Sequence, residues 1–191
     1  MIKFNKKLID SIKKSITGGA IGIIPTDTIY GIVCLAMNKK SVERVYKLRK
    51  RNPKKPVIIL ISSIKDLKLF NVKVDKEKKM LELLWPNKIS IVLNCPEKKF
   101  EYLHRGKKTL AFRMPKDKEL LSLLKATGPL IAPSANIEGK KPAQNIKKAQ
   151  EYFGSNVDFY IDGGNLNSEP STIISIISGG IKVIRKGLVR I

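Results

Sequence analysis

The stretch that decides the fold is "AIGIIPTDTIYG", residues 20–31, in which an apolar run ends at a proline and a polar turn follows. The apolar run is typical of a buried strand. Open α/β sheets bind their ligands beyond the ends of their strands, so the turn with Thr26, Asp27 and Thr28 is a candidate for ligand binding. The same side chains could instead cap the next element through hydrogen bonds to the backbone, and on this motif alone both interpretations stand.

Alternating helix and strand patterns extend outward from this stretch. Before it, apolar residues recur at helical spacing between a capping Asn5 and the pair Gly18-Gly19. After it, we predict helices from about residue 41 and near 63–70, 75–84, 117–127 and 143–154, and strands from Pro56 and at 88–94, 109–114, 129–133, 158–162, 171–177 and 181–185. The pattern predicts an α/β fold, a twisted open mixed β-sheet with flanking helices, as a single domain over residues 1–191.

The net charge of the chain indicates which classes of partner to consider. The formal net charge is +22, from 31 lysines and 7 arginines against 16 acidic residues. Such an excess attracts polyanions, so nucleic acid, nucleotides and anionic surfaces are the partner classes to consider. We expect much of the lysine to be ordinary solvated surface. Arginine is more informative, because its planar guanidinium holds phosphate and carboxylate in a fixed geometry.

The cysteines and the single histidine argue against a zinc site and a nucleophile. Cys34 and Cys95 lie in apolar or strand-like settings without CxxC spacing, so we expect reduced thiols in the core. His104 stands in "YLHRGKK", and we expect it in a solvated loop. Neither a Walker A loop nor a GxGxxG pattern occurs. No apolar leader or membrane-spanning run occurs, so we expect a soluble, cytoplasmic protein.

A run of cations precedes the strand that begins at Pro56. The stretch "RKRNPKKPV", residues 49–57, sets five cations within eight positions. Lys54 or Lys55 alone could be solvated, since cations suit the end of a helix. Arg49, Lys50 and Arg51 are consecutive, and like charges repel one another, so we expect at least some of them to face an anion.

Further polar residues mark the ends of other predicted strands. Ser134 and Asn136 follow a short apolar strand in "APSANIEG", where they could face a phosphate or sugar or simply form a turn. Arg113 lies inside the apolar strand "TLAFRMP" with Thr109 four residues earlier. A buried guanidinium is costly unless paired, and few acids lie nearby in the sequence, so a bound carboxylate or phosphate is a good candidate partner for Arg113.

The last such cluster lies near the C-terminus. Ser171 opens the predicted strand in "PSTIISI", and Arg185 ends the strand in "VIRKG". Hydroxyl groups and an arginine again mark strand ends, as they do at the earlier clusters.

In this order and spacing the motifs resemble the YrdC-like family, the threonylcarbamoyl-AMP synthases. The family patterns PT[DE]TVYGL, KxRP, LAVR, SANxxG, PSTI and RxG correspond here to "PTDTIYGI", "RKRNPKKPV", "LAFRMP", "SANIEG", "PSTI" and "RKG". The matches cover roughly residues 18–188. The chain departs from the family patterns at Arg49, where the pattern has Lys, and at Asn52, where it has Pro. The stretch "WPNKIS" also matches the family pattern WPGPxT only in part.

The resemblance implies the YrdC-like fold and a nucleotidyltransferase activity. L-threonine, bicarbonate or CO2 and ATP would condense to threonylcarbamoyl-AMP and pyrophosphate, the first step towards the t6A modification of adenosine 37 in tRNA. ATP would be a substrate, Mg2+ would share the phosphate charge, and no metal site of the protein's own is expected. Because the chain ends soon after "RKG", it resembles the single-domain form, which relies on separate proteins to transfer the threonylcarbamoyl group to tRNA.

The resemblance also implies roles for individual residues. Arg49 and Arg51 would be catalytic, clamping the ATP phosphates together with Lys55. The expected ATP-binding residues are Arg51, Lys55, Thr109, Ser134, Asn136 and Arg185. The expected threonine-binding residues are Thr28, Arg113 and Ser171.

Two other functions remain open at this stage. The first is a module that binds double-stranded RNA or tRNA, for which the positive charge is suitable, although no stacking aromatic residues interleave the cations near residue 50. The second is a paralogue with the same fold and a lost or altered activity, which the changed KxRP motif makes credible. Turnover that depends on threonine would separate both from the synthase.

Overall fold

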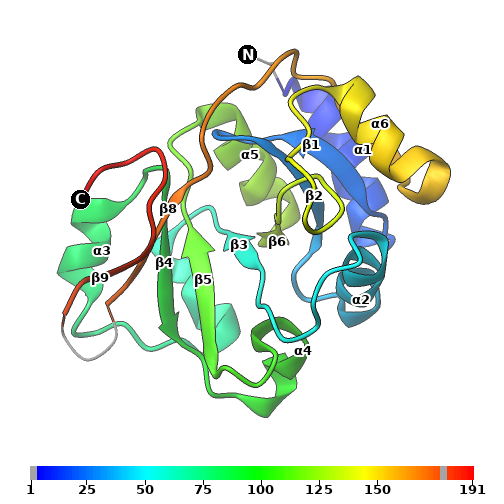
Figure 1. Cartoon of the computed structure of the whole chain (residues 1–191). Helices are drawn as coiled ribbons and strands as arrows, with labels where there is room; N and C mark the ends of the chain where they lie inside the picture. The colour runs from blue at the N-terminus through cyan, green and yellow to red at the C-terminus, as the bar shows by residue number, and fades with distance from the viewer. Residues whose placement is uncertain (1–3, 177–179) are drawn as a thin grey trace.

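The structure is a computed structural model that describes residues 4–176 and 180–191. Within these residues one mixed sheet of nine strands forms, in the order β7-β1-β2-β6-β3-β5-β4-β8-β9 (Figure 1). Three pairs are parallel (β1 with β7, β3 with β5, β4 with β8) and the other five are antiparallel, which confirms the predicted mixed α/β sheet. The strands are β1 (Gly22–Pro25), β2 (Tyr30–Leu35), β3 (Ile58–Leu60), β4 (Ile89–Asn94), β5 (Thr109–Arg113), β6 (Leu130–Ile131), β7 (Phe159–Tyr160), β8 (Thr172–Ser175) and β9 (Lys182–Arg185).

The helices begin where side chains can cap them. Asn5 accepts a hydrogen bond from the Leu8 amide at 2.9 Å, as the sequence predicts, and Asp117 caps its helix in the same way. The α-helices are α1 (Lys6–Thr17), α2 (Lys39–Leu48), α3 (Lys78–Leu84), α4 (Glu101–His104), α5 (Lys118–Thr127) and α6 (Ile146–Phe153), and the 3₁₀ helices are η1 (Ile64–Phe70), η2 (Lys98–Phe100) and η3 (Gly154–Asn156).

Two apolar clusters cover opposite faces of the β1–β2 part of the sheet. Alternate residues of β1 divide between them, since Ile23 packs in the larger cluster and Ile24 in the smaller one. The smaller cluster joins α1 and α5, and the larger one includes residues of α2 and α6. Both Ile23 and Ile24 are fully buried, so this half of the sheet is a closed core.

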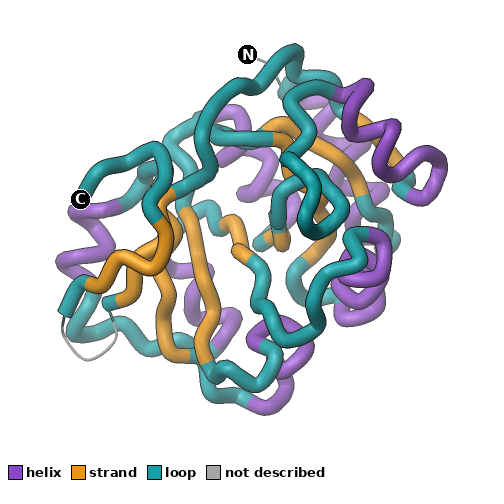
Figure 2. The backbone as a smooth tube through the Cα atoms, in the orientation of Figure 1, coloured by secondary structure: helices purple, strands orange, loops and turns teal. Residues whose placement is uncertain are grey.

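The other half of the sheet has one face that no described helix covers, and the candidate site lies on this face. On β5, Leu110 and Phe112 point into the larger core, whereas Thr109, Ala111 and Arg113 point to the opposite face. That face is covered by loops rather than a helix: Figure 2 shows the long loop between β7 and β8 crossing from one side of the sheet to the other. A cleft lined by strand residues is therefore left open.

Several expected elements differ in detail from the structure. β2 was not predicted, although it is a buried strand. The helix expected near 63–70 is a 3₁₀ helix, and the one expected at 75–84 begins only at Lys78. The predicted strand at 171–177 ends at Ser175, and Ile177 lies outside the described residues.

His104 is not in a solvated loop, and that prediction was wrong. It ends the short helix α4, its side chain is buried, and the ring contacts the Glu97 carbonyl at 3.2 Å and accepts from the Gly106 amide at 3.1 Å. Lys107 and Lys108 are exposed, whereas the Arg105 side chain is only 12% exposed and forms an ion pair with Glu43. Its role is to hold this turn together.

The two cysteines are where the sequence analysis expected them, in the core. Cys34 and Cys95 are buried free thiols, and burial raises the pKa of both, that of Cys95 to about 11. Along the chain that the structure describes, no helix has the length and apolar character needed to cross a bilayer.

Candidate active site

Two adjoining cavities lie on the uncovered face of the sheet. The first, of about 120 Å³, is lined by five of the predicted site residues: Thr28, Arg113, Ser134, Ser171 and Arg185. The second, of about 240 Å³, is lined by four of them: Arg51, Thr109, Ser134 and Arg185. The cavities share Ile58, Ser134 and Arg185, so residues from distant parts of the sequence meet in one cleft.

The turn between β1 and β2 forms one wall of the first cavity. Thr26 closes this turn, because its hydroxyl donates to the Ile29 carbonyl at 2.7 Å and accepts from the Thr28 amide at 3.2 Å. The capping interpretation of the motif is thus correct for Thr26. Thr28 lines the cavity, and its hydroxyl lies 3.2 Å from that of Thr26, so the turn contributes to both structure and site.

The segment with Ser134 and Asn136 runs beside β2. Gly31 forms an antiparallel bridge with Ser134, and the Ala135 amide donates to the Tyr30 carbonyl at 2.8 Å. A side chain on Gly31 would approach Thr26, at 3.3 Å from its methyl group, so glycine permits this close approach. Ser134 is thereby held at the boundary of the two cavities.

Arg113 has a partner that the sequence argument did not identify. Its Nη2 lies 2.9 Å from Oδ1 of Asp27, and the two side chains are only 5% and 3% exposed. The expectation that few acids lie near Arg113 was wrong, because the β1–β2 turn brings Asp27 to the end of β5. Burial raises the pKa of the Asp27 carboxyl, and the charges of Arg113 and Lys88 oppose that rise.

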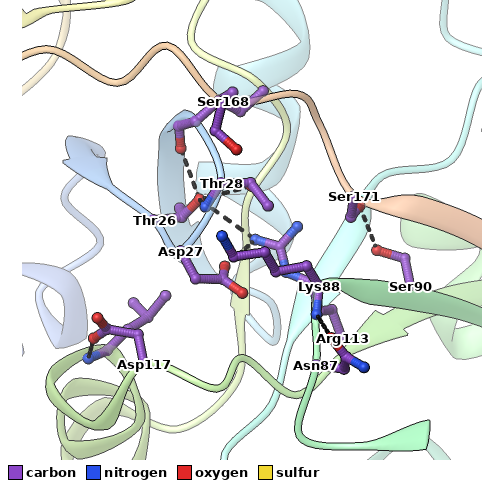
Figure 3. Close-up of polar contacts among 12 residues, drawn as sticks. Thr26, Asp27, Thr28, Asn87, Lys88, Ser90, Arg113, Asp117, Ser168 and Ser171 are labelled. Carbon is purple, nitrogen blue, oxygen red and sulfur yellow. Dashed lines mark hydrogen bonds and ion pairs between the residues drawn. The ribbon is translucent and has the colours of Figure 1, made fainter. Parts of the chain in front are cut away.

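The pairing of Asp27 and Arg113 is incomplete. No described residue gives either carboxylate oxygen of Asp27 a well-directed hydrogen bond, and Nε of Arg113 likewise has no partner. Figure 3 shows Asp27, Arg113 and Lys88 lying close together beside the turn. Because Nη2 of Arg113 also donates to the Thr26 hydroxyl at 3.4 Å, Nε is the guanidinium donor left without a partner among the described residues.

Ser171 and Arg185 form the opposite wall. The Ser171 hydroxyl lies 2.9 Å from the hydroxyl of Ser90 (Figure 3). Nη2 of Arg185 donates to the Ser171 carbonyl at 2.7 Å. Burial lowers the pKa of Arg185, and repulsion by Arg113 lowers it further. Two arginines that repel each other across a cavity favour an anion between them.

Arg49 lies behind the cleft. It is 3% exposed and lines neither cavity. Its Nε donates to the Asn136 carbonyl at 3.0 Å, and Nη2 donates to Oδ1 of Asn136 at 3.1 Å and to the Ser134 hydroxyl at 3.3 Å. Burial, and then the charge of Arg51, lowers the pKa of Arg49 to about 10. In this structure Arg49 holds the serine and asparagine segment in place.

Asn136 is likewise engaged within the protein. It is buried, lines neither cavity, and its amide nitrogen donates to the carbonyls of Ile137 and Lys140 at 2.9 and 2.7 Å. Together with the bonds from Arg49, these contacts use both ends of the side-chain amide.

The cationic loop after α2 is tied to the same segment through Glu138. Lys55 forms an ion pair with Glu138 at 2.5 Å and lines neither cavity, although its side chain is 58% exposed. Arg51 donates to the Pro56 carbonyl at 2.6 Å and lines the second cavity. Of the consecutive cations at 49–51, Arg51 is thus the one on the cleft wall. Glu138 was missed in the sequence, although it lies within the motif "SANIEG".

These features define a class of protein: an open mixed α/β sheet with a cleft lined by arginine side chains and hydroxyl groups. A protein-family model for Sua5, YciO and YrdC proteins, described as telomere recombination, matches residues 14–187. The chain belongs to this family.

Named relatives give the family a chemical context. A protein of Methanocaldococcus jannaschii, which carries a provisional name as a threonylcarbamoyl-AMP synthase, is 32% identical over 187 residues, covering 97% of this chain and 88% of the relative. The threonylcarbamoyl-AMP synthase of Pyrococcus abyssi is 30% identical over 172 residues, covering 88% of this chain and 51% of the relative. That of Marinobacter nauticus is 28% identical and covers 87% of this chain and 90% of the relative.

Solved structures agree with the fold. The structure of P. abyssi Sua5 complexed with L-threonine has a TM-score of 0.88 and 28% identity, covering 96% of this chain and 55% of that one. This chain thus spans about half the length of that protein. E. coli YciO has a TM-score of 0.84 at 22% identity, which supports the fold alone.

Proposed function

We propose that this protein is an L-threonylcarbamoyladenylate synthase, which condenses L-threonine, bicarbonate or CO2 and ATP and releases pyrophosphate. The observation that carries the proposal is the pair of adjoining cavities, one at Arg113 and Ser171 and one at Arg51 and Thr109. A site for an amino acid beside a site for a nucleotide is what this condensation needs. The synthases among the relatives and the threonine complex of Sua5 support the same chemistry.

The first cavity suits threonine. Its volume of about 120 Å³ fits a small amino acid, and Arg113 offers free donors to a carboxylate. Thr28 and Ser171 supply hydroxyl groups at the same cavity, where they would bond the amino and hydroxyl groups of the substrate.

The second cavity suits ATP. Arg51 and Arg185 lie on its walls and would contact phosphates, with the hydroxyls of Thr109 and Ser134 beside them. Val92, Ile173 and Ile184 add an apolar surface on which a base could pack. Ser134 and Arg185 border both cavities, so they would lie near the α-phosphate, where the two substrates meet.

The geometry assigns supporting roles to the remaining predicted residues. Arg49 and Asn136 would act by fixing Ser134, rather than by touching phosphate as the sequence analysis expected. Lys55 would reach the phosphates only by leaving Glu138, an exposed ion pair of the kind that contributes little to stability.

The chain's contribution to the reaction is positioning and charge. The carbamate formed on the threonine amine carries an oxygen that attacks the α-phosphate in line, and pyrophosphate departs. Arg51 and Arg185 would stabilise the charge on the departing pyrophosphate, and Arg113 would hold threonine still. Mg2+, when bound, would neutralise phosphate charge. The described residues gather no group of three acidic, histidine or cysteine ligands, so the phosphates themselves would supply most of its ligands.

The proposed product indicates which other molecules this protein would work with. Threonylcarbamoyl-AMP would serve the t6A modification of tRNA, in the cytoplasm, with separate proteins making the transfer. Of the arginines at 49–51, Arg49 is buried and bonded to Asn136, so it is not available to contact RNA. The affinity of non-specific binding to nucleic-acid phosphates falls steeply as the salt concentration rises. Measuring the affinity for tRNA at several salt concentrations would therefore show whether this protein binds RNA in that way.

The test is pyrophosphate release by the purified protein with ATP, Mg2+, bicarbonate and L-threonine. We expect release to depend on threonine and to cease when L-threonine is replaced by L-alanine, which cannot fill the hydroxyl contacts. Release that is the same with and without threonine would contradict the proposal.

Replacing Arg51 by alanine should lower threonine-dependent pyrophosphate release by at least about tenfold, because one charge contact to the phosphates is lost. Steady-state assays at varied ATP would measure the effect. Lys54→Ala is the matched control, since Lys54 is an exposed cation of the same loop that lines neither cavity. Equal rates for the Arg51 variant and the wild type would exclude this contact.

Gly187→Ala should raise the KM for threonine by about tenfold. An added Cβ would lie 2.3 Å from the Pro170 carbonyl oxygen and 2.7 Å from the Ser171 carbonyl carbon, and backbone atoms yield only by moving Ser171. Gly180→Ala, where an added Cβ would meet open space, is the control. A KM unchanged in the Gly187 variant would show that Ser171 does not border the threonine site.

A further inference from the structure

Lys88 is a charged residue beside the site that the proposed mechanism does not use. It precedes β4, is half-buried, and its backbone is fixed by a bond from its amide to Oδ1 of Asn87 at 2.8 Å and from the Thr172 amide to its carbonyl at 3.2 Å. Figure 3 shows its side chain extending towards Asp27 and Arg113. Because Thr172 directly follows Ser171, the bond from the Thr172 amide places the Lys88 backbone beside the segment that contributes Ser171 to the first cavity.

The ion pair of Asp27 and Arg113 raises a difficulty for carboxylate binding. The two groups lie 2.9 Å apart and almost fully buried, so together they are close to neutral. A neutral pair attracts an incoming carboxylate much less than a free guanidinium does, and Asp27 itself repels it. A further cation beside Asp27 would remove this difficulty.

Lys88 is placed to be that cation. Within the described part of the chain its ammonium has no hydrogen-bond or ion-pair partner of its own, while its charge acts on Asp27. The other charged groups that act on Asp27 are Arg113, which attracts it, and Asp117, which repels it. With the half-buried Lys88 included, the three side chains of Lys88, Asp27 and Arg113 carry one net positive charge.

We propose that Lys88 is a positioning residue that engages the charge of Asp27 when threonine binds, so that Arg113 is free to hold the substrate carboxylate. The incoming carboxylate repels Asp27 and takes its place on Arg113, and Asp27 turns to Lys88. This inference rests on the proposed function, since it assigns the carboxylate of threonine to Arg113.

The first test is calorimetric titration of L-threonine into the full chain. We expect Lys88→Met to weaken threonine binding about tenfold, because the buried group loses its net charge, and to leave ATP binding within twofold. Lys88→Arg should restore most of the affinity, since it keeps the charge. Lys79→Met, which removes an exposed lysine of α3, is the control and should bind as the wild type does.

A double variant separates charge from shape. Asp27→Asn in the Lys88→Met background returns one net positive charge to Arg113, so threonine affinity should rise above that of Lys88→Met alone. A structural role for Lys88 would instead leave the double variant as weak as the single one or weaker, and that outcome would overturn the proposal.

The second test does not depend on threonine. The pKa of the Asp27 carboxyl, measured by carbon-detected NMR on labelled protein, should rise in Lys88→Met, since Lys88 favours the charged form of Asp27. An unchanged pKa, or threonine binding by Lys88→Met within twofold of the wild type, would overturn the inference. If the wild type binds no threonine, the proposed function fails, and the Asp27 titration still decides whether Lys88 and Asp27 are coupled.

Discussion

Replacing Arg113 by alanine is expected to lower kcat/KM for threonine by at least about a hundredfold, the largest effect on activity that this structure predicts. Arg113 lines the first cavity, and its Nε has no hydrogen-bond partner among the described residues. Its removal deletes the charged partner of the substrate carboxylate. Steady-state pyrophosphate release at varied threonine, with binding of ATP measured separately, would show whether the loss is confined to threonine.

The same substitution should also destabilise the protein, and this has to be separated from its effect on activity. Removing one partner of a buried ion pair costs about 3–5 kcal/mol, because the carboxylate of Asp27 is left uncompensated. The double variant Asp27→Asn/Arg113→Ala removes both charges and should recover much of the thermal stability while remaining inactive. If the double variant uses threonine with a KM within threefold of the wild type, Arg113 does not bind this substrate.

Replacing Arg49 by methionine is expected to have the second largest effect. The change removes three hydrogen bonds to Ser134 and Asn136 and leaves buried acceptors without donors. Each such loss costs about 1–3 kcal/mol, so the three together cost about 3 kcal/mol or more and Tm should fall by at least about 6 °C. Pyrophosphate release should fall by about thirtyfold at a temperature where the variant is folded, because Ser134 is no longer held at the boundary of the two cavities.

A conservative variant tests whether this effect comes from positioning. Arg49→Lys carries the residue of the family pattern and can still donate to Oδ1 of Asn136 or to the Ser134 hydroxyl. We expect it to keep about a third or more of the wild-type rate, with a smaller loss of Tm. An Arg49→Met variant with the Tm and rate of the wild type would contradict the positioning role.

The sheet and most of its elements could be predicted from the sequence, because apolar patterns and caps are local. Asn5 and the glycine pair at 18–19 mark the first helix correctly. β2 was missed because its residues are buried on both faces, so it is a continuous apolar run with no alternation to distinguish strand from helix. His104 was misplaced because the charged sequence around it suggested a solvated loop, whereas tertiary packing buries both its ring and most of the Arg105 side chain.

The candidate site could be predicted only in part, for a physical reason. The residues on the cavity walls, such as Arg113 and Arg185, lie at strand ends that the sequence reveals. Which of them contact each other depends on the order of strands in the sheet, and this order is not local. The pairing of Asp27 with Arg113, and the engagement of Arg49 with Asn136, therefore appear only in the structure.

The central claim is that one cleft holds a triphosphate and an amino-acid carboxylate side by side. The most direct measurement is a crystal structure of the wild-type protein with L-threonine and a non-hydrolysable ATP analogue. The account predicts the threonine carboxylate on Arg113 beside Ser171, and the phosphates between Arg51 and Arg185. Threonine or phosphates bound outside the two adjoining cavities, with Arg113 still paired only to Asp27, would contradict it.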